Sequence, residues 1–205
     1  MTRPLAVQAR RRGGAVALGI AVAVLGTTAL VALGGAVPPW EEALFRWGNA
    51  SGPPEPVVWT VMQLGNLLAV PAVVLLAVAV RRVRLAVELL VAGVTAYLLA
   101  RVLKELVDRD RPAELLADVE LRGAGDAGRG FPSGHAAVVA ALAYLVLTRV
   151  PPRWRWAVAV VALLVCLARV HVGAHLPLDV AGGAALGVAC ASAVLLAGGD
   201  GRERR

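Results

Sequence analysis

Long stretches without any charged residue are the feature that most limits how this chain can fold. The first of them runs from Ala15 to Val37. At about 1.5 Å per residue, a helix over this stretch is long enough to cross a hydrocarbon core of about 30 Å. Hydrophobic residues make up 59% of the chain and charged residues only 17%, which is too apolar for an ordinary soluble domain. The sequence therefore predicts a protein embedded in a lipid bilayer.

The apolar runs predict helices rather than strands. Backbone groups in a bilayer must bond to one another, which restricts spanning segments to helices and closed barrels, and the runs lack the alternation of barrel strands. The expected fold class is all-α, with one domain over residues 1–205 that forms a polytopic bundle of six transmembrane helices. The expected spans are residues 15–37, 57–80, 85–103, 131–148, 156–168 and 180–199.

Arginine clusters between the runs predict the orientation in the membrane. With six spans, all four clusters fall on one side, and the positive-inside rule makes that side cytoplasmic. Both termini are then cytoplasmic, as basic tails over residues 1–14 and 200–205, and residues 113–130 form an extracytoplasmic loop. The clusters consist of Arg3, Arg10, Arg11 and Arg12; Arg81, Arg82 and Arg84; Arg149, Arg153 and Arg155; and Arg202, Arg204 and Arg205.

Composition and spacing also argue against several kinds of site. The net charge of +7 does not indicate a nucleic-acid partner, because the arginines form no stripe interleaved with aromatic residues. Cys166 and Cys190 lie inside apolar runs, away from other residues at metal-ligand spacing, and are predicted to be small core residues. Residues 38–56, the first outward segment, are predicted to form an interfacial turn or short helix without a role in chemistry.

Polar residues gather in three groups at the outward ends of the third to sixth expected spans. Ionisable groups at a membrane are costly, and their presence there indicates function. Because the topology places all three groups on one face, we expect them to form one site. The groups are Lys104 with Arg111-Pro112; Pro132-Ser133-Gly134-His135; and Arg169, His175 and Asp179.

Five of these residues are suited to hold a phosphate. Lys104 and Arg111 are seven residues apart, so they share a face if the third helix extends to Pro112. Ser133 and Gly134 open the fourth helix, where unpaired amides and the helix dipole attract an anion and the hydroxyl adds a donor. Arg169 brings a planar fork of donors to the end of the fifth helix.

The two histidines and the aspartate supply the chemistry. His175 and Asp179 are four residues apart, which on a helix lets the carboxylate accept a bond from one imidazole nitrogen and leaves the other free to attack. His135 starts the fourth helix on the same side and is placed to protonate the leaving oxygen. The cations and amides balance the charge on the phosphoryl oxygens, so no metal and no cofactor are expected.

In order and spacing, the three groups resemble the signature of the type 2 phosphatidic acid phosphatase superfamily, which includes lipid phosphate phosphatases, bacterial acid phosphatases and vanadium haloperoxidases. The resemblance implies a covalent phosphohistidine on His175, oriented by Asp179, with His135 as the acid. It also implies a phosphate held by Lys104, Arg111, Ser133, Gly134 and Arg169. One departure is Ala168, where the family usually has serine, which bears on the strength of phosphate binding more than on the chemistry.

Other polar residues are predicted to have supporting roles. His171 is expected to lie near the site without taking part directly, and Arg109 to be solvated or to act behind the catalytic residues. Glu88 is expected near the cytoplasmic end of the third helix, as a boundary residue. The loop 113–130 is rich in glycine and acidic residues, which predicts a flexible segment that serves as a lid.

The sequence thus predicts a metal-independent phosphatase of the cell membrane that acts on a lipid phosphate or diphosphate at the extracytoplasmic face. We favour a polyprenyl diphosphate as its substrate. Phosphatidic acid and phosphatidylglycerophosphate are alternatives, as is transfer of the phosphate to another lipid or sugar. A transporter of anionic lipids is a different class, and it predicts charges at mid-membrane, whereas here they cluster at one face. The residues leave the oligomeric state open.

Overall fold

Helices form the whole regular structure of the described residues, which are 3–50, 52, 55–123 and 128–198 in a computed structural model of the chain. The expected all-α class is confirmed. The elements are α1 (Arg3–Leu33), α2 (Pro39–Ala50), α3 (Glu55–Met62), the 3₁₀ turn η1 (Gln63–Gly65), α4 (Ala69–Ala79), α5 (Val83–Val107), α6 (Pro112–Leu115), α7 (Gly134–Leu147), α8 (Pro152–His171) and α9 (Pro177–Ala197).

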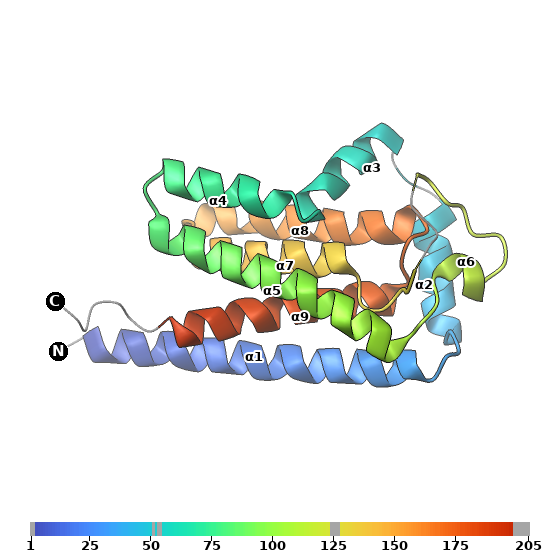
Figure 1. The fold of residues 1–205 in the computed structure, drawn as a ribbon, viewed down its shortest axis with the longest axis horizontal. Coiled ribbons are helices and arrows are strands. Elements are labelled where there is room, and N and C mark those ends of the chain that lie inside the picture. Colours follow the sequence, from blue (N-terminus) through green and yellow to red (C-terminus); the bar gives the residue numbers. More distant parts are fainter. Residues whose placement is uncertain (1–2, 51, 53–54, 124–127, 199–205) are drawn as a thin grey trace.

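The short helix α7 lies at the centre of the bundle, packed against α5, α8 and α9, while α1 runs along the outside of α9 (Figure 1). Small residues allow this close packing. A Cβ atom on Gly183 would lie 2.3 Å from the carbonyl oxygen of Ser133, and one on Gly187 would lie 2.2 Å from that of Ala137. Glycine is therefore required where α9 crosses α7.

The outer surface of the bundle is apolar. Leu30, Leu75, Leu98 and Leu163 lie on four different helices, and each is more than half exposed, which suits contact with lipid tails rather than water. Four helices are long and apolar enough to cross a membrane, or five spans if α3 and α4 count as one broken span. Helix α7 has 14 residues and is shorter than a full span. The chain is thus a multi-pass membrane protein, and a sixth crossing stays a prediction.

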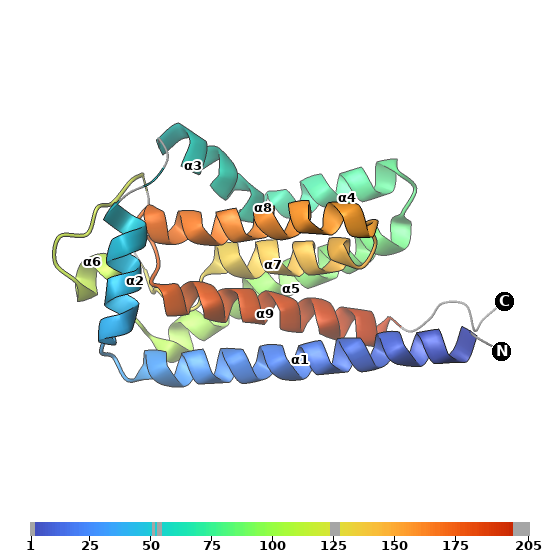
Figure 2. The same ribbon diagram turned by 180° about the vertical axis from the view of Figure 1, so that it is seen from behind.

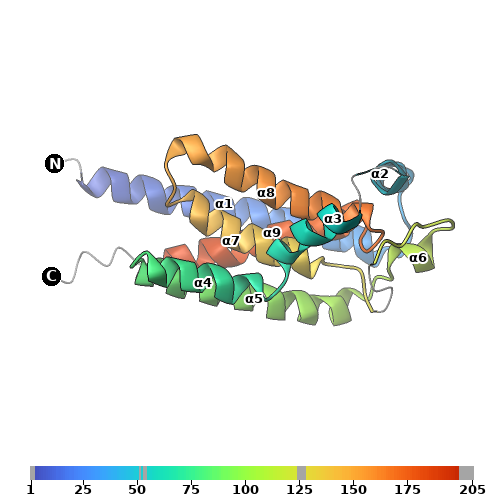
Figure 3. The ribbon, with the colours of Figure 1, turned by 90° about the horizontal axis from the view of Figure 1, so that it is seen from above.

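The second expected span, residues 57–80, is not one straight helix. The segments Pro56–Gly65 and Ala69–Ala79 meet at an angle of 67°, and α3 turns away from the line of α4 (Figure 3). Asn66 is extended, and its side chain accepts a bond from the backbone N–H of Leu68, a local bond that competes with the helix. A Cβ on Gly65 would lie 2.7 Å from Val165, so this glycine lets the bend approach α8.

The two ends of the bundle differ in content. The turn between α4 and α5 and the loop between α7 and α8 lie at one end, with the start of α1 and the last turn of α9 (Figure 1). Because Arg81, Arg84, Arg149 and Arg153 lie in or beside these connections, we call it the arginine end. The opposite end carries α2, which lies across the ends of α8 and α9 (Figure 2). We call it the site end, because all three predicted groups of polar residues lie there.

Candidate active site

The first group, Lys104 and Arg111, does not share one helix. Helix α5 ends at Val107 because Asp108 adopts a left-handed conformation, with φ at 53°, and donates its N–H to the carbonyl oxygen of Lys104. Arg111 lies beyond this break, at the start of α6. The condition under which both cations share a face, a third helix that extends to Pro112, is therefore not met. The charges of both side chains nevertheless act on His175, as its pKa shows below.

The second group opens α7 as predicted. Ser133 is extended and caps the helix, and Gly134 is its first helical residue. The Ser133 hydroxyl oxygen is buried and has no hydrogen-bond partner among the described residues. A Cβ on Gly134 would meet no atom within 4 Å. The first turn of α7 thus combines unpaired amides, a hydroxyl and open space, which suits a bound anion.

The third group spans the loop between α8 and α9. Arg169 lies in the last turn of α8, as expected, and its carbonyl oxygen accepts a bond of 3.2 Å from the N–H of His175. Helix α9 begins only at Pro177, a residue that favours the first helical position. His175 therefore lies in the loop, and the expectation that it shares a helical face with Asp179 is wrong. Asp179 lies in the first turn of α9.

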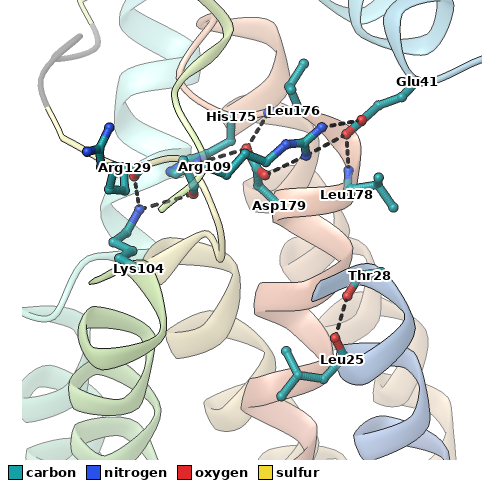
Figure 4. Close-up of polar contacts among 11 residues, drawn as sticks. Leu25, Thr28, Glu41, Lys104, Arg109, Arg129, His175, Leu176, Leu178 and Asp179 are labelled. Atoms are coloured by element: carbon teal, nitrogen blue, oxygen red, sulfur yellow. Dashed lines mark hydrogen bonds and ion pairs between the residues drawn. The ribbon is translucent and has the colours of Figure 1, made fainter. Parts of the chain in front are cut away.

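His175 and Asp179 nevertheless face each other (Figure 4). The imidazole Nδ1 of His175 lies 3.7 Å from Oδ2 of Asp179, and both side chains are almost fully buried. This separation is longer than a hydrogen bond, and Nδ1 has no hydrogen-bond partner among the described residues. Because catalytic hydrogen bonds are often long without substrate, a small movement of the imidazole is enough to form this one.

Charged residues from all three groups act on the imidazole of His175. The pKa of His175 lies well below its ordinary value of 6.5, so the folded protein holds a neutral imidazole. Burial is the largest cause, because it penalises the charged form. The other causes, in decreasing order, are the charges of Arg169, Lys104, Arg111 and His135.

Lys104 binds the segment that leads into α7. Its ammonium group donates to the carbonyl oxygen of Arg129 and, at 3.1 Å, to that of Gly130. A Cβ on Gly130 would lie 2.8 Å from the carbonyl oxygen of Asp110 and 3.0 Å from Oδ2 of Asp179, so this position requires a glycine. The segment thus brings the end of α5 and the start of α9 together.

A further part of the site is formed by Glu41, which sequence reasoning missed, and Arg109, for which the sequence left two roles open. Arg109 is only 3% exposed and donates to Oδ1 of Asp179 at 3.0 Å. It also binds both carboxylate oxygens of Glu41, at 3.2 and 2.6 Å. The structure thus places Glu41 of α2 beside the candidate site, although residues 38–56 are predicted to have no role in chemistry. Of the two expectations for Arg109, a position behind the catalytic residues fits and a solvated one does not. A glutamate beside a tryptophan in a short segment between two apolar runs gives no sign of this burial.

The loop 113–130, which is predicted to be a lid, is held in part by hydrogen bonds to neighbouring elements. Asn49 of α2 donates to the carbonyl oxygens of Glu120 and His171, each at 2.9 Å. Arg122 donates to the carbonyl oxygen of His171 at 2.7 Å. The described part of the loop is therefore held against α2 and α8, and residues 124–127 lie outside the described residues. His171 is buried, and its Nδ1 lies 3.1 Å from the Gly48 carbonyl oxygen.

The two remaining predictions concern metal sites and Glu88. Among the described residues there is no cluster of three or more histidine, cysteine, aspartate or glutamate side chains that fits a metal ion. Glu88 lies at the arginine end, as expected, but it is buried and paired with Arg84 at 2.9 Å and Arg149 at 2.6 Å. It is thus a buried ion-pair partner rather than a boundary residue.

Comparison with known proteins gives one family and several relatives. The PAP2 superfamily matches residues 85–201. Undecaprenyl-diphosphatase from Sulfolobus acidocaldarius is 33% identical over 119 residues, which cover 58% of this chain and 57% of that protein. The match thus spans little more than half the length of this relative.

Two solved structures are similar to this chain. The crystal structure of LpxE from Aquifex aeolicus has a TM-score of 0.70 and 27% identity, covering 75% of this chain and 93% of that chain. A PAP2-type phosphatidylglycerolphosphate phosphatase from Bacillus subtilis has a TM-score of 0.66 and 23% identity, covering 88% of this chain and 97% of that one. The second likeness concerns the fold alone.

Proposed function

Because this chain belongs to the PAP2 superfamily of membrane phosphatases, we propose that it removes phosphate from a lipid through a phosphohistidine on His175. One observation carries the proposal. His175 is buried and neutral, and it lies among the charges of Lys104, Arg111 and Arg169. A neutral imidazole is a nucleophile, and the surrounding cations attract the phosphate that it attacks.

In the first step, the Nε2 lone pair of His175 forms a bond to phosphorus while the P–O bond to the leaving group breaks. Asp179 accepts a hydrogen bond from the Nδ1–H of the imidazole as positive charge develops on the ring. His135 gives its proton to the leaving oxygen. The leaving group is a lipid alcohol for a monoester and a lipid monophosphate for a diphosphate.

In the second step, water attacks the phosphohistidine. The N–P bond breaks and returns its electron pair to Nε2 of His175, and inorganic phosphate leaves. His135 takes a proton from the attacking water, which restores its starting state. Every proton that His135 gives in the first step is therefore recovered in the second.

The remaining predicted residues hold the phosphoryl oxygens. Their role is to balance the charge on these oxygens as the P–O bond breaks, and such electrostatic stabilisation accounts for most of the catalysis in phosphoryl transfer. The buried, unpartnered hydroxyl of Ser133 and the open space beside Gly134 support a phosphate at the start of α7. The cations and amides supply the charge that a metal ion supplies in other phosphatases, so we expect activity without a metal. These residues are Lys104, Arg111, Ser133, Gly134 and Arg169.

A lipid substrate suits a charged site at one end of a bundle with apolar sides, because the tails stay among lipids while the headgroup reaches the site. We favour a polyprenyl diphosphate, which the named relative from Sulfolobus acidocaldarius supports. Phosphatidic acid and phosphatidylglycerophosphate are alternatives, and the same residues permit transfer to another acceptor. Clustering of the charges at one end argues against the transporter.

For the topology, we propose six crossings. In this arrangement α3 and α4 form one broken span, and α7 is a short span shielded by α5, α8 and α9. The site end then faces outward and the arginine end faces the cytoplasm.

The test is the release of phosphate by the purified protein in detergent, with a panel of lipid monophosphates and diphosphates, with and without EDTA. We expect activity on at least one lipid, unchanged by EDTA and abolished by His175→Ala. The matched control is His171→Gln, which changes a buried histidine that is not among the proposed catalytic residues and should keep activity. Activity that survives His175→Ala, or that EDTA abolishes, would rule out the proposed mechanism.

A further inference from the structure

Three charged side chains from distant parts of the sequence meet behind the candidate nucleophile (Figure 4). Glu41 comes from α2, Arg109 from the connection between α5 and α6, and Asp179 from α9. All three side chains are at most 1% exposed. Burying charges costs several kcal/mol per ion, and well-packed apolar residues are often as stabilising. Stability alone therefore does not account for this cluster.

The two carboxylate oxygens of Asp179 accept hydrogen bonds from different groups. Oδ1 accepts from Arg109 at 3.0 Å. Oδ2 accepts from the backbone N–H of Leu176 at 2.9 Å and is also the oxygen nearest to His175. Because both oxygens are held, the carboxylate cannot rotate about its own axis without breaking a bond. Its orientation toward the imidazole is thus fixed from two sides.

Glu41 in turn fixes Arg109. Its two carboxylate oxygens bind the two terminal nitrogens of the guanidinium group, a planar arrangement that allows little rotation. Oδ1 of Asp179 shares one of those nitrogens with Glu41. Glu41 Oε1 also accepts the N–H of Leu178 at 2.9 Å. The glutamate therefore anchors both the arginine and the first turn of the helix that carries Asp179.

The charges of the cluster support the same role. With both carboxylates ionised, the cluster carries two negative charges and one positive charge. Arg109 is thus shared between two carboxylates and does not neutralise Asp179 alone. When Asp179 is ionised, its negative charge stabilises the imidazole as His175 becomes positive during attack.

Arg109 also reaches the segment that leads into α7. Its backbone carbonyl accepts the N–H of Gly130 at 2.6 Å, and the carbonyl of Gly130 in turn accepts from Lys104. One residue thus contacts both the carboxylate behind the nucleophile and the segment that holds a phosphate-binding lysine.

We propose that Glu41 and Arg109 are positioning residues, which hold the Asp179 carboxylate in the orientation that lets it accept a hydrogen bond from Nδ1–H of His175. This inference rests on the proposed function, in which His175 is the nucleophile. Neither residue touches the substrate, and both act through Asp179. Their loss should slow attack by the imidazole without weakening the binding of a phosphate at the start of α7.

The experiment compares Glu41→Gln and Arg109→Lys with Glu42→Gln. Glu42 is the matched control, because it neighbours Glu41 and forms an exposed pair with Arg46. Steady-state phosphate release should give a kcat lowered by about 10- to 100-fold in the first two variants, as expected for a misplaced reacting group, with KM changed by less than about threefold. Glu42→Gln should match the unmodified protein.

A second measurement separates positioning from folding. Orthovanadate takes a five-coordinate form that bonds to an imidazole nitrogen, as a transition-state analogue does, whereas inorganic phosphate binds only through the cations and amides. We expect the affinity for vanadate to fall in Glu41→Gln and Arg109→Lys by about the same factor as kcat, while the affinity for phosphate stays constant. Calorimetric titration gives both affinities even for a variant without turnover.

Each outcome decides between the alternatives. A kcat of Glu41→Gln equal to that of Glu42→Gln overturns the inference. An equal fall in the affinities for vanadate and phosphate also overturns the inference, because it shows that the variant has lost the structure of the whole site. If Glu41→Gln does not fold, Arg109→Lys, which keeps the positive charge but not the planar fork, decides in its place. His175→Ala in the same series tests the proposed function separately. Retained turnover in this variant would refute His175 as the nucleophile, and not only the positioning role of Glu41 and Arg109.

Discussion

Both ends of the bundle bury a carboxylate against arginine, but they do so differently. At the arginine end, Glu88 pairs with Arg84 and Arg149, whose side chains are 46% and 23% exposed. At the site end, Asp179 pairs with Arg109, whose side chain is 1% exposed. The arginine end therefore keeps its cations in contact with the surroundings, and the site end buries the paired cation completely.

This difference fits a structural ion pair at the arginine end and supports the positioning role proposed for the pair at the site end. The Glu88 cluster links α5 to the loop after α7 and, through Arg84, to the carbonyl oxygen of Gly198 at 3.1 Å. Its two arginines are already partly exposed, and Glu88 keeps one of them if the other is lost, so the cost of losing one arginine is moderate. At the site end, loss of Arg109 leaves buried carboxylates that have no cation and cannot reach solvent.

The largest effect should come from removing one carboxylate charge at each end. Asp179→Asn should lower kcat for phosphate release by about 10³- to 10⁴-fold, because the imidazole loses its orienting acceptor. Glu88→Gln makes the same chemical change at the arginine end and should leave kcat within about twofold. Phosphate release from the same lipid substrate measures both. Equal losses in the two variants would mean that the ends do not differ in function.

A smaller effect, on stability, should follow from removing an arginine at each end. Arg109→Met leaves Glu41 and Asp179 buried without their cation, so we expect the free energy of unfolding to fall by about 3–5 kcal/mol. Arg149→Met leaves Glu88 paired with Arg84 and should cost about 1 kcal/mol. Denaturant unfolding in detergent measures both. A comparable loss in Arg149→Met would contradict the distinction drawn between the two clusters.

The smallest effect should appear in the pH dependence of stability, because all three histidines of the chain lie at the site end. The pKa of His175 is well below 6.5 in the folded protein, whereas an unfolded histidine has a pKa of about 6.5. As the pH falls below about 6.5, the unfolded chain binds a proton that the folded chain does not, so His175 destabilises the fold by up to about 1.4 kcal/mol per pH unit.

His175→Gln should therefore lose less stability than the unmodified protein between about pH 6.5 and 5. Melting temperatures across this range measure the difference. Arg149→Met, at the arginine end, should keep the pH slope of the unmodified protein. Parallel slopes for His175→Gln and the unmodified protein would show that the imidazole is not held neutral.

The residues of the candidate site could be predicted because each group is local in the sequence. Ser133 and Gly134 open α7 directly after Pro132, and Arg169 lies in the last turn of α8, just before the loop that contains Gly173. The hydropathy pattern alone predicted that these groups lie at one end of the bundle. Their placement in detail could not be predicted, since it depends on where helices stop. Asp108 ends α5 before Arg111, and Pro177 starts α9 after His175.

By itself, the sequence determined that the chain is a helical membrane protein, and it located the candidate nucleophile, acid and phosphate-binding residues. Those features follow from apolar length and from short spacings, which do not depend on the rest of the fold. Only the tertiary structure decided that Glu41 and Arg109 belong to the site. They lie 68 residues apart, and they meet because α2 lies across the end of the bundle. Pairing between buried charges is a property of packing, and no local pattern in the sequence encodes it.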